Sequence, residues 1–210
     1  DSIFEKKAYF AFKLRNEKLE RRVLLIQEMS KQKSANQWGF DPKESLNSSF
    51  VLPSQLELRL SGFYYDEAEH RERFPAVFSE VARSLCNSYP GYLTFSRFVV
   101  DYGMIRGLLQ DVDVDEQPIK KILGKYGFTR RAGSDIASGD YSGFVAVREH
   151  RFLKKDSIRE LLAAAKIFLQ KPLRTSVHVD TLYACTENAA GYCDEIASIK
   201  INCDSQKVDL

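Results

Sequence analysis

The sequence is constrained most by a run of aromatic and β-branched residues from Tyr92 to Val100, which follows turn residues at 87–91. Such residues fit a pleated, buried surface, so the run predicts an interior β-strand. On either side, apolar residues recur three or four positions apart, the spacing of amphipathic helices. Because helical and strand patterns alternate, we expect an α/β or α+β domain built around a single mixed sheet.

The other elements are predicted from the same periodicities. Helices are expected at 3–29, 67–86, 118–127, 156–170 and 187–195. Strands are expected at 50–52 and 56–64, which form a hairpin, at 128–131 and 143–149, which pair with each other, and at 176–185 and 198–202. The polar stretch 31–49 is expected to be a loop around Trp38 and Phe40.

Composition narrows the class of protein. The 210 residues suit one domain. The 31 basic and 29 acidic residues give a net charge of +2, which is too small for the electrostatic field of the whole protein to attract nucleic acid or an anionic membrane. No apolar run approaches the ~18 residues that a transmembrane helix needs. We therefore expect a cytoplasmic protein without a membrane partner. The start at Asp1 rather than Met indicates a trimmed or processed chain.

Four cysteines bear on metal and redox chemistry: Cys86, Cys185, Cys193 and Cys203. Their spacing lacks the C-x2-C pairs of zinc sites and no histidine lies among them, so no metal site is predicted. Reduced cysteines are expected for a cytosolic protein, although Cys185 and Cys203 are placed to form one bridge. Cys185 and Cys193 flank one short segment, which allows them to lie close in space.

The stretch after the predicted interior strand is the most informative for chemistry. Tyr102 to Gly107 includes Gly103 and Arg106 and is expected to turn from the strand into helical residues. A strand that runs into such a turn and a helix presents free backbone N–H groups, which suit a phosphate or pyrophosphate. A plain turn without a ligand is the alternative interpretation.

Short motifs follow one another in a characteristic order over residues 38–150. They are Phe40-Asp41, the hairpin with Arg59, Phe74-Pro75, Ser96-Arg97-Phe98-Val99-Val100-Asp101, and the helix that ends at Gly127-Phe128. This order resembles the GNAT acyltransferase superfamily, in its acyl-homoserine-lactone synthase and N-acyl amino acid synthase branches. The resemblance implies a central mixed sheet with helices on both faces. It also implies an acyltransferase core at 1–150 and a helix–strand extension at 151–210 that completes or packs on the sheet.

The resemblance implies an N-acyltransferase that moves an acyl group from acyl-CoA or acyl-ACP to a small-molecule amine, as an autoinducer synthase does, without a tightly bound cofactor. Acyl carrier protein is then an expected partner. Ser96 and Asp101 take the catalytic roles, and Asp101, Asp41 or Glu57 accepts the proton of the amine, because Thr94 stands near where the family has an acidic residue. The donor-binding residues are Arg59, Arg97, Phe98, Val99, Gly103, Arg106 and Gly107.

A second hypothesis is a non-enzymatic, winged-helix-like nucleic-acid-binding module. Its phosphate-binding surface comprises Lys120, Lys121, Lys125, Arg130 and Arg131, with the loop to Ser142 as the wing. Three other features are interpreted as structural. The acidic residues Asp111, Asp113, Asp115 and Glu116 precede a helix that they would cap, the histidines His70, His150 and His178 are isolated, and Cys86 is a small hydrophobe.

Overall fold

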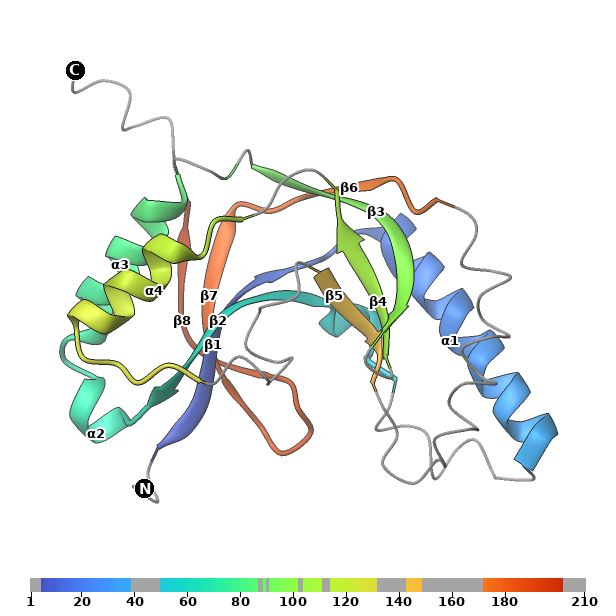
Figure 1. The fold of residues 1–210 in the computed structure, drawn as a ribbon, viewed down its shortest axis with the longest axis horizontal. Helices are drawn as coiled ribbons and strands as arrows, with labels where there is room; N and C mark the ends of the chain where they lie inside the picture. Colours follow the sequence, from blue (N-terminus) through green and yellow to red (C-terminus); the bar gives the residue numbers. More distant parts are fainter. Residues whose placement is uncertain are drawn as a thin grey trace.

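The chain folds into two four-stranded antiparallel sheets (Figure 1). This structure is a computed structural model, and it describes residues 5–38, 50–86, 89, 91–101, 104–110, 114–131, 143–148 and 172–201. The first sheet, here called the β1 sheet, has the order β2 (Glu57–Tyr65), β1 (Lys6–Lys13), β7 (Thr181–Glu187) and β8 (Cys193–Lys200). The second, the β3 sheet, has the order β5 (Gly143–Val147), β4 (Met104–Leu109), β3 (Tyr92–Asp101) and β6 (Thr175–His178).

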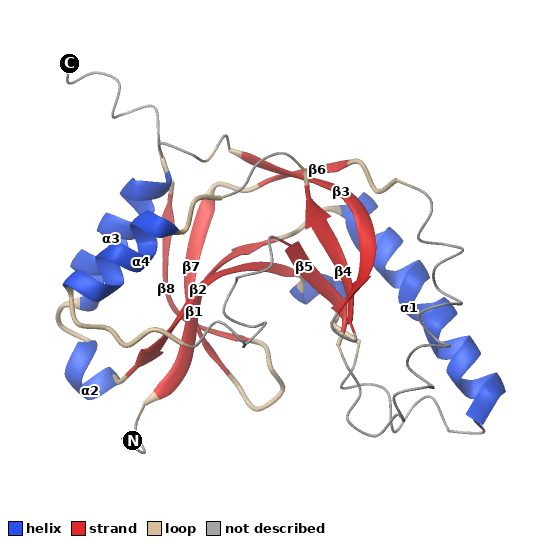
Figure 2. Cartoon of the chain, viewed as in Figure 1, coloured by secondary structure: helices blue, strands red, loops and turns tan. Residues whose placement is uncertain are grey.

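Helices flank the two sheets on opposite sides of the molecule (Figure 2). The long helix α1 (Glu17–Trp38) contacts β5, whereas α3 (Phe74–Leu85) contacts β8 and α4 (Gln117–Lys125) contacts β2. Two short pieces, η1 (Pro53–Gln55) and α2 (Glu67–His70), lie before and after β2. No helix within the described ranges is long and apolar enough to cross a membrane.

Aromatic side chains fill the core between the β1 sheet and α3. The ring of Phe10 lies 5.0 Å from that of Phe63 and 5.9 Å from that of Phe78, centroid to centroid, and Phe128 meets Phe63 edge-on at 5.6 Å. Offset and edge-on pairs of this kind add to the stabilisation that burial of the rings already provides. The apolar stripe of α3 completes this part of the core with Phe74, Val77, Phe78, Val81, Ala82 and Leu85.

The mixed α+β class and the interior position of β3, which lies between β4 and β6, are confirmed. The single mixed sheet is wrong, because the strands of the described ranges pair antiparallel throughout and form two sheets. The boundary between residues 1–150 and 151–210 stays a prediction, and strands from both sides of it share each sheet.

The helix predicted at 3–29 is half wrong, because its first part forms β1. The apolar positions Phe4, Ala8 and Phe12 are four residues apart, a spacing that fits one face of a helix and also one face of a strand. From Ala8 to Phe12 every residue is buried, on both faces of the sheet, so the alternation that marks a half-exposed strand is missing.

Three predicted strand connections are also wrong. Phe50 forms an isolated bridge with Val147 instead of a hairpin with β2. Residues 128–131 form no strand, since only Arg130 makes a bridge, to Phe63, and β5 pairs with β4. The helix predicted at 187–195 is a turn followed by β8.

The helices predicted at 67–86 and 118–127 are confirmed in the main, the first as α2 and α3 and the second as α4. The loop predicted at 31–49 begins too early, since α1 continues to Trp38. The helix predicted at 156–170 lies outside the described residues.

Candidate anion-binding site

The two sheets meet where β2 lies close to β5. Just before β2, the Val51 N–H donates to the Ala146 carbonyl at 3.2 Å. The buried side chain of Gln27, from α1, donates to the carbonyls of both Val51 and Ala146, at 2.6 and 3.0 Å. These bonds hold the segment before η1 and β2 against the end of β5.

Three arginines and two glutamates gather near this junction: Arg59, Arg131, Arg148, Glu57 and Glu187, here called the arginine cluster. The Arg59 Nε donates to Glu57 Oε1 at 2.7 Å, and its Nη1 lies 3.4 Å from Glu187 Oε2. Arg131 is 2% exposed, and its Nη1 lies 3.8 Å from the same Glu187 oxygen. Glu187 therefore joins two arginines that are far apart in the sequence.

Arg148, directly after β5, differs from the other two arginines. It donates from Nη1 to the Ala190 carbonyl at 3.3 Å and from Nη2 to the Gly191 carbonyl at 2.9 Å, and it lies over the ring of Tyr192. Among the described residues no carboxylate lies within ion-pairing distance of Arg148. Among the described residues, its guanidinium donates hydrogen bonds to backbone carbonyls and lies over an aromatic face.

The pKa values of two cluster arginines move in opposite directions. Burial acts to lower the pKa of Arg59, but the charges of Glu57 and Glu187 outweigh it, with Tyr9 adding to them, and the net pKa is raised. Burial lowers the pKa of Arg148, and the positive charge of Arg59 lowers it further. The charges of Glu187 and Glu57 offset part of this lowering, so Arg148 is the cation of the cluster that feels carboxylates without a direct ion pair among the described residues.

The tyrosine beside the cluster adds no negative charge. Tyr9 is fully buried, lies under the Arg59 guanidinium and donates its hydroxyl to Glu57 Oε1 at 2.8 Å. Burial is the main cause that raises its pKa, so it stays protonated. Three guanidinium groups against two carboxylates leave the cluster with one net positive charge, which a bound anion would offset.

The turn between β7 and β8 supplies most of the partners of the cluster. The Asn188 side-chain oxygen accepts from the N–H groups of Ala190 and Tyr192, both at 3.0 Å, and so builds the turn. Gly191 has a φ of 81°, a backbone conformation that favours glycine, and a Cβ there would lie 2.3 Å from Arg148 Nη1 and displace the end of that side chain.

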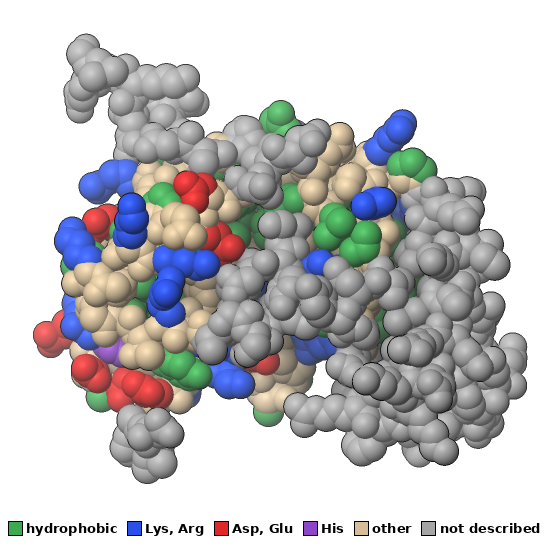
Figure 3. Space-filling view, viewed as in Figure 1, with side chains coloured by type: hydrophobic (Ala, Val, Ile, Leu, Met, Phe, Trp, Pro, Cys, Tyr) green, Lys and Arg blue, Asp and Glu red, His purple; other side chains and the backbone are tan. Residues whose placement is uncertain are grey.

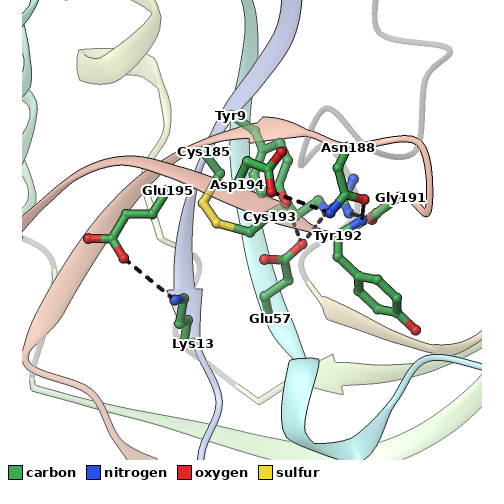
Figure 4. The surroundings of a disulfide bond; sticks show 11 residues. Tyr9, Lys13, Glu57, Cys185, Asn188, Gly191, Tyr192, Cys193, Asp194 and Glu195 are labelled. Carbon is green, nitrogen blue, oxygen red and sulfur yellow. Dashed lines mark hydrogen bonds and ion pairs between the residues drawn. A yellow bond between two sulfur atoms is a disulfide. The ribbon is translucent and has the colours of Figure 1, made fainter.

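A disulfide between Cys185 and Cys193 closes this turn (Figure 4). Within the described ranges, Glu187, Ala190, Gly191 and Tyr192, all of them partners of the cluster arginines, lie inside the closed segment 185–193. The expectation of reduced cysteines is wrong for this pair, and the partner of Cys185 is Cys193 rather than Cys203.

Of the residues predicted to bind the acyl donor, Arg59 makes contacts in the arginine cluster. Arg97 is exposed on β3, Val99 is partly exposed there, and Phe98 is buried edge-on to Phe144 at 6.0 Å. The predicted catalytic Ser96 also lies on β3, where its carbonyl accepts from the Leu173 N–H at 2.7 Å.

The predicted strand–turn–helix cradle is a β-hairpin instead. Asp101, the other predicted catalytic residue, ends β3 and pairs with Met104 at the start of β4. Arg106 is buried on β4, and Gly107, next to it, lies against the ring of Phe144. Because a strand follows the turn, no helix N-terminus directs backbone N–H groups at this point. Gly103 and Asp41 lie outside the described residues.

Neither Arg148 nor Glu187 stands out in the sequence as a candidate site residue. A single sequence carries one local signal for this region, the residues Asn188 and Gly191 between two alternating segments, which is typical of a tight turn between paired strands. What the turn binds depends on contacts with β2 and β5, which no local pattern encodes.

The winged arrangement is wrong as well, because residues 128–131 form no strand with 143–149. Lys125 of α4 pairs with Glu80 of α3 at 3.2 Å. On the face shown in Figure 3, basic side chains over this side of the molecule alternate with acidic ones rather than forming one patch. Of the acidic residues before α4, Asp115 accepts from the Gln117 N–H at 3.0 Å and Glu116 accepts from Ser61, so both have structural contacts.

No family model matches the chain, and no curated protein matches it. Among solved structures it is similar to Usb1 of Kluyveromyces marxianus, with a TM-score of 0.51 and 14% identity over 95% of this chain and 99% of that one. The same protein with uridine monophosphate gives a TM-score of 0.53, also at 14% identity, over 93% and 98% of the two chains. The expected GNAT-type acyltransferase is therefore wrong: the chain shares its fold with Usb1.

Proposed function

We propose that this protein binds the phosphate of a nucleotide or of an RNA strand at the arginine cluster. The observation that carries the proposal is Arg148, a partly buried guanidinium beside Arg59 that has no carboxylate partner among the described residues. A second support is that one structure with the same fold, that of Usb1, was determined with uridine monophosphate.

A phosphate suits this cluster better than a carboxylate or a neutral ligand. Guanidinium groups donate paired N–H bonds whose geometry matches phosphate oxygens, and charge-assisted bonds of this kind are about twice as strong as neutral ones. The doubly charged group would also outcompete the carbonyls of Ala190 and Gly191, which hold Arg148 only through their dipoles.

The described members of the cluster favour binding over hydrolysis. Arginine stays charged at all ordinary pH values and Tyr9 stays protonated, so these groups offer charge and hydrogen bonds rather than proton transfer. No described histidine belongs to the cluster. His70 packs against Phe128, and His178, at the end of β6, lies beside Tyr92 of β3.

Calorimetric titration of the protein with uridine monophosphate and a short oligouridylate, at low salt, tests the proposal. We expect Arg148→Gln to weaken binding about 10- to 100-fold, the scale of one charge-assisted contact. The matched control is Arg21→Gln on α1, where the Arg21 side chain is 77% exposed and pairs with Glu17. Absence of binding to the unmodified protein, or equal binding by Arg148→Gln, would overturn the proposal.

A further inference from the structure

Three side chains with metal-binding atoms converge next to the arginine cluster. One ligand atom each from Glu57, Cys185 and Cys193 lies within 4.8 Å of the other two. Cys185 is fully buried on β7, and Cys193 is partly exposed at the start of β8. Glu57 begins β2, which is separated from β7 by β1 (Figure 4). The two sulfurs are joined as a disulfide in this structure.

We propose that Cys185, Cys193 and Glu57 bind a thiophilic divalent cation, Zn²⁺ in the first instance, when the disulfide is reduced. Two thiolates and a carboxylate are a ligand set that zinc accepts, and a fourth, tetrahedral position stays open to water. This site shares Glu57 with the arginine cluster, but its proposal does not rest on phosphate binding. The cysteine spacing alone predicts no metal site, because it cannot include a carboxylate from β2.

The geometry requires little movement to bind the metal. Zinc–sulfur bonds of about 2.3 Å in a tetrahedral site place two sulfurs roughly 3.8 Å apart. The Cα atoms of the two cysteines are 5.2 Å apart, so rotation about side-chain bonds is enough to open the disulfide to that separation. The partly exposed Cys193 gives the cation a path from solvent.

The carboxylate is already oriented for a role as ligand. Its Oε1 accepts from the Tyr9 hydroxyl at 2.8 Å and from the Arg59 Nε at 2.7 Å. Its Oε2 accepts no hydrogen bond from another described residue. Groups that hold one oxygen of a ligating carboxylate fix the direction in which the other oxygen points.

The chemistry balances with a dithiol as reductant. Two electrons and two protons from the dithiol convert the Cys185–Cys193 disulfide into two thiols, and the dithiol becomes a cyclic disulfide. Binding of Zn²⁺ then displaces the two thiol protons and leaves two thiolates. With Glu57 these carry three negative charges against the two positive charges of the cation, and Arg59, which pairs with Glu57, supplies the third positive charge. The oxidised and metal-bound states exclude each other, because the same sulfurs serve both.

Cobalt titration of the full chain tests the proposal. After reduction with dithiothreitol and anaerobic removal of the reductant, we expect Co²⁺ to produce a thiolate-to-cobalt charge-transfer band that one equivalent of Zn²⁺ removes. The oxidised protein should give no band. Reduced wild-type protein without a band would overturn the proposal.

Variants separate this site from the other cysteines. Cys193→Ser should lose the band, and Glu57→Gln should keep the fold and bind Co²⁺ about tenfold or more weakly. Cys86→Ser and Cys203→Ser are the matched controls and should bind as the wild type does. A band that persists in Cys193→Ser, that depends on Cys203, or that is unaffected by Glu57→Gln would overturn the assignment.

Discussion

The two faces of β2 differ in how they are stabilised. On one face Leu58 and Leu60 pack in the apolar core. The hydrophobic effect that stabilises this face does not depend on the direction of particular contacts. On the other face Glu57 and Arg59 depend on particular atoms of Tyr9 and of the β7–β8 turn. The stability of the apolar face therefore depends on the side-chain volume that fills it. The stability of the charged face depends on the presence of each charged or hydrogen-bonding partner. The variants below measure that difference.

The largest loss is expected on the apolar face. Phe10 is fully buried and contacts two other rings, so Phe10→Ala removes ring burial and leaves a cavity. We expect the free energy of unfolding to fall by about 3–5 kcal/mol, measured by urea denaturation. Phe10→Leu, which retains most of the volume, should cost much less. Equal losses in the two variants would show that this face is not close-packed.

On the charged face the result should depend on how many partners are removed. Arg59→Ala leaves Glu57 and Glu187 partly buried without their main counter-charge and should cost roughly 3 kcal/mol. The double variant Glu57→Gln/Arg59→Met removes both charges and should recover part of that loss. Denaturation of the singles and the double gives the coupling energy. Additive losses would mean that the pair contributes independently of its partners.

A somewhat smaller effect is expected at the disulfide. Cys185 and Cys193 are eight residues apart. In the chain-entropy account, closing so short a loop lowers the entropy of the unfolded chain and so stabilises the folded state by about 2.5 kcal/mol. Cys185→Ser/Cys193→Ser should lower the stability by that order, and it should also weaken phosphate binding, because the closed segment holds the partners of Arg148. Denaturation and calorimetry in parallel measure both effects, and Cys86→Ser is the control.

The smallest effect is expected at Arg97. This side chain is exposed on β3, on the sheet opposite to the one that holds Arg59. Arg97→Ala should change the free energy of unfolding by less than about 0.5 kcal/mol and leave nucleotide binding unchanged. A loss of binding comparable to that of Arg148→Gln would extend the binding surface onto β3.

Prediction from sequence succeeded where the pattern was local. Three elements are predicted by patterns that span only about ten consecutive residues. These patterns are the apolar stripe of α3, the proline at the start of α4, and the run of β-branched and aromatic residues in β3. It failed at β1, whose apolar spacing fits both a helix and a strand, and at the pairing of β5, which depends on a distant strand. Arg59 was found as a candidate, whereas its neighbour Arg148 comes from a segment almost ninety positions later in the sequence.

The carbonyl of Gly191 has a mechanical consequence. It accepts from Arg59, on the β1 sheet, at 2.6 Å and from Arg148, at the end of the β3 sheet, at 2.9 Å. A carbonyl oxygen has two lone pairs, so these two bonds saturate it. The two sheets therefore share one acceptor at this point. A phosphate that draws Arg148 away would remove the Arg148 bond to this oxygen, while the Val51–Ala146 bond and the two bonds of Gln27 would continue to join the sheets.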